Sequence, residues 1–92
     1  MQIDAFQIAL KEFNTEFDIP MNLADRVDKQ YEETVEFCAA VNHGSDSERR
    51  EEALDTLICG FQNCLAMNIP NPLFAAYLKL QKNAAKYRES LC

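Results

Sequence analysis

The sequence predicts an all-α fold: an antiparallel helical hairpin with flanking helices, of the four-helix-bundle type. Apolar residues recur at steps of three and four along most of the chain, as on amphipathic helices. The 92 residues are 48% hydrophobic and include only two glycines and three prolines, a composition typical of a packed helical protein. We expect residues 1–92 to form one domain. A domain of this size buries a modest share of its surface, so we expect dimerisation to complete the bundle.

The first two expected helices are separated by a proline break. The first covers about residues 3–17 and ends at Asp18-Ile19-Pro20, because proline disfavours a helical conformation in the residue before it. Asn22 then has the side chain to cap a second helix over about residues 23–42 by accepting hydrogen bonds from free amides. We expect Gly44 to end this helix in the left-handed conformation that glycine adopts readily.

The third and fourth helices have start signals of their own. Ser45 and Glu48 have the spacing of a capping box ahead of a third helix over about residues 46–67, which completes the hairpin. Asn71 is the expected cap of a fourth helix over about residues 72–89, with Pro72 at its first position, where a missing amide costs nothing.

Each helix has a predicted apolar face. The residues expected to pack are Ile3, Phe6, Leu10, Phe13 and Phe17 on the first; Leu23, Val27, Tyr31, Thr34, Cys38 and Val41 on the second; Ala53, Leu54, Leu57, Ile58, Phe61 and Leu65 on the third; and Leu73, Tyr77, Leu80, Ala84 and Tyr87 on the fourth.

Two acidic pairs lie on the hairpin helices, Glu33 with Glu36 and Glu52 with Asp55. Residues three apart lie about 60° apart around a helix, so two antiparallel helices would bring the four carboxylates together. Such close like charges repel unless a cation or a shared proton relieves them. Oxygen-only ligands suit Mg²⁺, or Mn²⁺ as an alternative. The competing interpretation is two solvated acidic helix faces.

The position of the first acidic pair leaves a choice open. Glu33 and Glu36 fall nearly opposite the apolar arc of their helix, in company with Phe37 and Ala40. A solvated face would carry acids there. The two apolar neighbours indicate instead a covered side, as at a dimer interface or in an enclosed pocket.

Net charge and hydropathy argue against several classes of protein, and the cysteines indicate a reducing compartment. The net charge of −6 and a pI near 4.6 argue against binding a nucleic acid polymer, which needs a basic face. No membrane-spanning run or secretory signal is present, so we expect a soluble, cytoplasmic protein without a membrane partner. The four cysteines lack metal-site spacing and are expected to be small buried thiols in a reducing compartment.

The fourth helix also has a basic stripe, formed by Lys79, Lys82, Asn83 and Lys86 within roughly 100° of one another. Three of the nine basic residues share this stripe. It is either a solvated face or a group that holds substrate phosphates opposite the acidic metal site.

Taken together, these motifs resemble the MazG-like all-α nucleotide pyrophosphohydrolases over about residues 13–88. The pattern is Glu-Glu-x-x-Glu from Glu32 to Glu36, fifteen residues, then Glu-x-x-Asp from Glu52 to Asp55, preceded by Lys29 and followed by a Lys-x-x-Lys-Asn segment. Many members have a further aspartate four residues after the one that matches Asp55, where this chain has Cys59. A tryptophan to stack on a base is also missing.

The resemblance implies Mg²⁺-dependent hydrolysis of a nucleoside triphosphate between its α and β phosphates, by a homodimer or homotetramer. The implied metal ligands are Glu33, Glu36, Glu52 and Asp55. Glu36 or Glu32 would orient the attacking water, and the implied phosphate contacts are Lys79, Lys82, Asn83 and Lys86.

Three other functions remain open at this stage. A non-enzymatic helical module would dimerise through its apolar faces and bind a basic partner through its acidic surface. A degenerate relative would bind nucleotide without cleaving it. Phosphoribosyl-ATP hydrolysis is a further option within the same superfamily.

Overall fold

The computed structural model describes residues 3–91, which form four α-helices and no strand. They are α1 (Ile3–Glu16), α2 (Leu23–His43), α3 (Asp46–Ala66) and α4 (Pro72–Leu91). The all-α prediction is confirmed, and each expected boundary lies within two residues of the observed one. None of these described helices is both long enough and apolar enough to cross a membrane.

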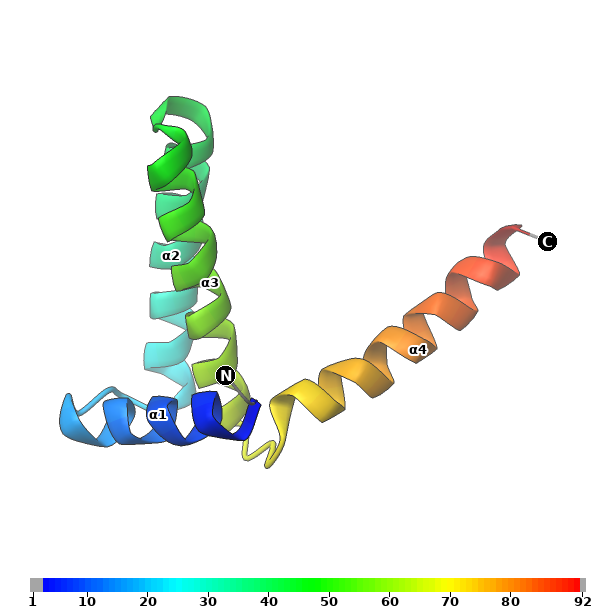
Figure 1. The fold of residues 1–92 in the computed structure, drawn as a ribbon, viewed down its shortest axis with the longest axis horizontal. Helices are drawn as coiled ribbons and strands as arrows, with labels where there is room; N and C mark the ends of the chain where they lie inside the picture. Colours follow the sequence, from blue (N-terminus) through cyan, green and yellow to red (C-terminus); the bar gives the residue numbers. More distant parts are fainter. Residues whose placement is uncertain (1–2, 92) are drawn as a thin grey trace.

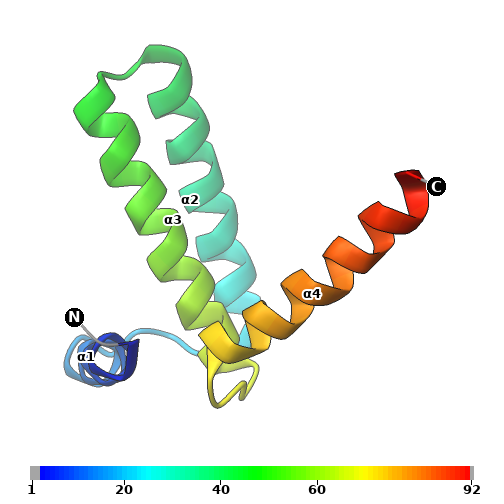
Figure 2. The same cartoon turned by 45° about the vertical axis from the view of Figure 1, so that its right-hand side comes forward.

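The four helices form an open arrangement around one hairpin. α2 and α3 lie side by side and antiparallel, α1 crosses the base of this hairpin, and α4 leaves the end of α3 and projects away from it (Figures 1 and 2). The hairpin is the main packed unit, since α2 and α3 share by far the most extensive contact between described elements.

The predicted caps explain where three helices begin. Asn22 Oδ1 accepts from the backbone amide three residues on, at 2.9 Å, and Asn71 Oδ1 does the same at 3.2 Å. At the start of α3 the Ser45 hydroxyl accepts from the Glu48 amide at 3.2 Å, and a Glu48 carboxylate oxygen accepts from the Ser45 amide at 3.3 Å. Each cap satisfies amides that a helix leaves without partners in its first turn.

The prediction that Gly44 adopts a left-handed conformation is wrong. Its φ is −92° and its ψ is 172°, an extended conformation, and its amide donates to the Ala40 carbonyl. Glycine suits this position for another reason: an added Cβ would lie 2.7 Å from the Ala40 carbonyl oxygen. The described non-glycine residues with positive φ are Asp18 and Asn68, at 52° and 60°, and each lies just beyond the end of a helix.

The face on which α2 packs differs from the predicted one. Its predicted apolar arc faces outward, with Val27 67% and Tyr31 73% exposed, whereas its buried residues are Arg26, Glu33 and Ala40. The hairpin is therefore closed by the side that carries the first acidic pair. Two helices bury only a narrow stripe of each other, so the apolar arc of α2 stays exposed in this hairpin.

The other predicted faces are only partly buried. Leu10 of α1 and Phe61 of α3 are buried as expected, while exposed members of those faces are Phe13, Phe17, Leu54, Leu57, Tyr77, Leu80 and Tyr87. The expectation of buried thiols holds for Cys59 but not for Cys38, which is exposed, and Cys64 is half-buried. Cys92 and the side chain of Ile3 lie outside the described part.

α1 is held against the base of the hairpin by a few specific contacts. The rings of Phe6 and Phe61 meet edge to face, with centroids 5.0 Å apart. Gln62 of α3 donates to Asn14 Oδ1 at 3.0 Å. Gln7 donates to the carbonyl of Pro70, in the connection before α4, at 2.7 Å. These contacts place α1 beside the lower half of the α2–α3 seam.

Candidate metal centre and its cavity

Three of the predicted ligands come together between α2 and α3. Glu33, Glu36 and Glu52 each offer a carboxylate oxygen, and these oxygens all lie within 4.8 Å of one another. Glu33 is buried, Glu52 is half-buried and Glu36 is exposed. The i,i+3 spacing on α2 and the antiparallel approach of α3 produce this cluster, as the sequence predicts.

Two oxygens at this cluster are buried without a partner. Oε2 of Glu33 and Oε2 of Glu52 are enclosed, and neither accepts a hydrogen bond from a described residue. An enclosed carboxylate oxygen without a donor is costly, because it has lost water and gained nothing in return. The two atoms come from facing helices, so a single cation between the helices would satisfy both.

Lys29 satisfies the other half of Glu33. Its ammonium lies 3.1 Å from Glu33 Oε1 and 3.4 Å from Glu32 Oε1. The hydrogen bond to Glu33 is the main cause that raises the pKa of Lys29, while partial burial opposes it. Lys29 therefore neutralises Glu32 and one oxygen of Glu33, and leaves Oε2 of Glu33 and Oε2 of Glu52 without a partner among the described residues.

The surroundings of Glu52 raise the pKa of its carboxyl. Burial raises the pKa of its carboxyl most, followed by repulsion from Glu36, Asp55, Glu33 and Glu51 in that order. The charged form is thus disfavoured by the environment in the absence of a cation. Both causes would be relieved by a positive charge placed among the carboxylates.

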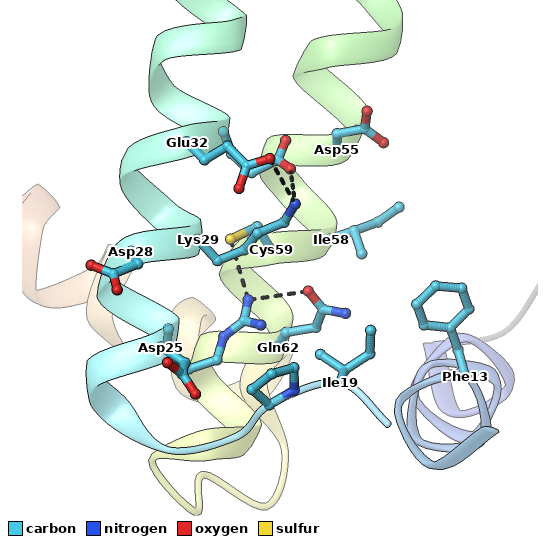
Figure 3. Close-up of a pocket in the computed structure, with 13 residues that line it drawn as sticks. Phe13, Ile19, Asp25, Asp28, Lys29, Glu32, Asp55, Ile58, Cys59 and Gln62 are labelled. Carbon is cyan, nitrogen blue, oxygen red and sulfur yellow. Dashed lines mark hydrogen bonds and ion pairs between the residues drawn. The ribbon is translucent and has the colours of Figure 1, made fainter. Parts of the chain in front are cut away.

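The fourth predicted ligand, Asp55, lies next to the cluster but outside the group of three. It is close enough to raise the pKa of Glu52, and its carboxylate points away from Lys29 (Figure 3). Glu32, one of the two residues expected to orient water, pairs with Lys29. The roles of Asp55 and Glu32 stay predictions.

A cavity of about 610 Å³ opens beside the cluster, along the α2–α3 seam and against α1 (Figure 3). Its volume is in the usual range of small-molecule sites. Lys29, Glu32 and Asp55 lie at its upper end in the view of Figure 3, whereas Phe13 and Ile19 lie at its lower end, at the level of Asp25. The lining residues are Phe13, Ile19, Pro20, Asp25, Arg26, Asp28, Lys29, Glu32, Glu33, Asp55, Ile58, Cys59 and Gln62.

The cavity floor is polar, and sequence reasoning missed it. Arg26 and Gln62 are both buried, with 5% and 6% of their surface exposed. The Arg26 guanidinium donates to Asn63 Oδ1 at 2.8 Å, to Gln62 Oε1 at 3.2 Å and to the Cys59 sulfur at 3.3 Å. Asn63 in turn donates to Gln30 at 2.8 Å. This network joins α2 to α3 directly below the acidic cluster.

A signal for this floor was present in the sequence. Arg26, Gln30, Glu33, Phe37 and Ala40 follow one another at steps of four and three, which is the spacing of one helix face. Phe37 and Ala40 accompany Glu33 and Glu36 on this face, and the same stripe extends back to Arg26.

The predicted phosphate-binding residues are not brought to the cluster within one chain. Lys79, Lys82, Asn83 and Lys86 belong to α4, which projects away from the hairpin (Figure 2). None of them lines the cavity beside the cluster. Their predicted role therefore requires α4 of another copy.

Models of known protein families, curated proteins and solved structures provide no match to this chain. The assignment of a function depends on the geometry and chemistry of the site.

Proposed function

We propose that the protein is a divalent-cation-dependent nucleoside triphosphate pyrophosphohydrolase, cleaving the bond between the α and β phosphates. The observation that carries the proposal is the pair of enclosed carboxylate oxygens, Glu33 Oε2 and Glu52 Oε2, which have no donor in the described chain. Glu33 and Glu52 form a cluster of ligand geometry with Glu36, and Glu33 also lines a cavity of nucleotide size. A purely structural acidic surface gives no reason to enclose these atoms.

The residues fit Mg²⁺ or Mn²⁺ rather than a softer metal. The cluster offers carboxylate oxygens alone, the donors that these hard ions prefer, and Mg²⁺ is usually held by a few carboxylates together with substrate phosphates. When bound, such an ion would offset phosphate charge and make a water molecule more acidic. The ligands in this account are Glu33, Glu36 and Glu52, with Asp55 as the fourth.

Hydrolysis needs a group that accepts a proton from water. In this account, Glu36 or Glu32 takes that proton as the water oxygen attacks the α phosphorus, and the α–β bridging oxygen leaves with pyrophosphate. Glu32 is oriented by Lys29, and the Lys29 ammonium lies at the cavity beside it. The lysine supplies positive charge at the end where the phosphates would lie.

The assembly completes the site in this proposal. The outward apolar arc of α2 and the exposed apolar residues of α4 favour association with a second copy. A second copy would also supply Lys79, Lys82, Asn83 and Lys86 from its own α4 to the phosphates. We propose a homodimer or a homotetramer on these grounds.

A non-catalytic helical module is the second candidate. The exposed apolar arcs favour association in that case as well, and the acidic surface would bind a basic partner. This alternative leaves the enclosed oxygens of Glu33 and Glu52 without a reason, so we rank it second.

The test is product analysis with a panel of canonical and modified nucleoside triphosphates, in Mg²⁺, in Mn²⁺ and in excess EDTA. The proposal predicts pyrophosphate and the matching monophosphate in equal amounts, and only with metal. Release of inorganic phosphate and a diphosphate would assign a different bond. Nucleotide binding without turnover would indicate the degenerate relative, and absence of both would favour the interaction module.

A further inference from the structure

Arg26 is a buried cation that forms no ion pair with an acidic side chain of the described residues. Only 5% of its surface is exposed, and its three side-chain hydrogen bonds go to neutral groups of Cys59, Gln62 and Asn63. Asp25 and Asp28 line the same cavity, but neither forms an ion pair with it. Buried charges in proteins are normally paired, so this guanidinium retains an unmet demand for an acceptor.

The unmet demand lies on one nitrogen. Nε and Nη2 of Arg26 donate within the network, whereas Nη1 donates to no described residue. In the described chain, the side-chain atoms that are both enclosed and without a hydrogen-bond partner are two carboxylate oxygens. Nη1 has no partner and is not one of these two atoms, so it is not enclosed and has access to open space. Arg26 lines this cavity and also a smaller one of about 350 Å³, and we assign Nη1 to the one that adjoins the acidic cluster.

Among the described residues, no neighbouring group accepts a hydrogen bond from Nη1 of Arg26. The Gln62 amide is used at both ends, since its oxygen accepts from Arg26 and its nitrogen donates to Asn14. A guanidinium carries donors only. Arg26 thus offers a hydrogen-bond donor to a ligand in the cavity. Its hydrogen bonds to Cys59, Gln62 and Asn63 hold the guanidinium in place.

The walls around this donor suit a flat ring. Phe13, Ile19, Pro20 and Ile58 line the same cavity, and Figure 3 shows Phe13 and Ile19 near its lower end, away from Glu32 and Asp55. A nucleotide whose phosphates lie at the acidic end would extend its base toward this apolar end. The base edge would then meet Arg26.

We propose that Arg26 is a specificity-determining residue that selects bases with a keto oxygen, at position 6 of a purine or position 4 of a pyrimidine. Guanine, hypoxanthine, uracil and thymine place an acceptor there, whereas adenine and cytosine place an amino group that faces the guanidinium donor to donor. The inference rests on the proposed function, since it assigns the base of the same nucleotide substrate.

The test compares kcat/KM for matched pairs: UTP with CTP, GTP with ATP, and GTP with 2-aminopurine riboside triphosphate, which lacks the 6-oxygen. We expect the keto member to be preferred by on the order of 10- to 100-fold. Arg26→Met should reduce this ratio to within about threefold, mainly by slowing the keto substrates. Arg50→Met, at an exposed arginine of α3, should leave the ratio unchanged.

Several outcomes would overturn the inference. Equal kcat/KM within the pairs would do so, as would an unchanged keto preference in an Arg26→Met variant whose circular dichroism is that of the wild type. If this variant does not fold, the wild-type comparison of GTP with its 2-aminopurine analogue decides alone, because the two bases differ in the 6-oxygen and the N1 proton that together make up the keto form of guanine.

The inference and the proposed function fail in different ways. Hydrolysis without keto preference removes the role of Arg26 and keeps the enzyme. If no triphosphate is hydrolysed, calorimetric titration with UMP, CMP, GMP and AMP in Mg²⁺ still decides: tighter binding of UMP and GMP supports the role of Arg26, and equal or absent binding overturns it.

Discussion

The Lys29 ammonium lies 3.1 Å from Oε1 of Glu33, while Oε2 of the same carboxylate is enclosed and has no hydrogen-bond partner in the described chain. One oxygen of this carboxylate is paired with a lysine, the other has no donor, and the residue belongs to a cluster with Glu36 and Glu52. Lys29 therefore leaves one oxygen of Glu33 available to the divalent cation that we propose.

Replacing Glu52 by glutamine should stabilise the protein in EDTA at neutral pH. Burial and then repulsion from Glu36 raise the pKa of Glu52 above its ordinary value of 4.5, so the folded chain binds this proton more tightly than the unfolded chain. Stability from protonation is present at low pH and is lost as pH rises from 4.5 through the raised value. Glutamine has no such loss.

The measurement is thermal or urea unfolding of wild type and Glu52→Gln in EDTA across this pH interval. The advantage of the variant should grow as pH rises, and added Mg²⁺ should stabilise the wild type but not the variant. A variant that is less stable than wild type at neutral pH in EDTA would contradict the strain assigned to Glu52.

Replacing Lys29 by methionine should destabilise the protein in EDTA by about 1 kcal/mol, a value between those of exposed and buried ion pairs. The pair is intermediate because the Lys29 side chain is 43% exposed and that of Glu33 is 9% exposed. Urea unfolding with Lys11→Met, at an exposed lysine of α1, gives the control. Equal stability of the two variants would mean that the Lys29–Glu33 pair contributes nothing.

Helix boundaries were predictable from the sequence because they depend on local chemistry. Asn22, Ser45 and Asn71 each satisfy a free amide within a few residues, and Asp18 and Asn68 end helices by their own backbone conformation. The meeting of Glu33, Glu36 and Glu52 was predictable for a related reason, since helix spacing and an antiparallel turn are enough to bring them together.

Which face of α2 is buried was not predictable in the same way. Apolar periodicity indicates which surface of a helix favours burial, but it does not specify what covers that surface. Val27 and Tyr31 are exposed in one chain, and the polar stripe of Arg26 and Glu33 closes the hairpin instead. The cavity depends on the crossing of α1 against the hairpin, which no local pattern specifies.

Placing a charge on the outward arc of α2 should dissociate the homo-oligomer that we propose. Tyr31→Glu adds an anion at a position 73% exposed in one chain, where a second copy would bury it at high cost. Sedimentation velocity should give wild type a mass at least twice the 10.5 kDa of one chain, and the variant the mass of one chain. Asn42→Asp, at an exposed polar position of the same helix, is the control.

A wild-type protein that sediments as a single chain at all concentrations would contradict this association. In that case Lys82 and Asn83 of α4 would have no route to the cluster, and their assignment to substrate phosphates would fall with it.

Removing the cap of α3 should lower stability without touching the site. Ser45→Ala loses the hydroxyl that accepts from the Glu48 amide at 3.2 Å, which costs about 1 kcal/mol, or roughly 4–8 °C in Tm for a domain of this size. The Mg²⁺-induced rise in Tm should be the same as in wild type. A lost response to Mg²⁺ would show that the cluster depends on the hairpin turn rather than on its own carboxylates.

We propose that the acidic cluster between α2 and α3 holds a divalent cation, a claim that can be tested by Mn²⁺ binding followed by electron paramagnetic resonance. Wild type and Glu12→Gln, a control at an exposed acid of α1, should bind Mn²⁺ and release it to excess Mg²⁺, whereas Glu33→Gln and Glu52→Gln should bind at least about tenfold more weakly. Equal Mn²⁺ affinity in all four proteins, or no binding by wild type, would contradict the claim.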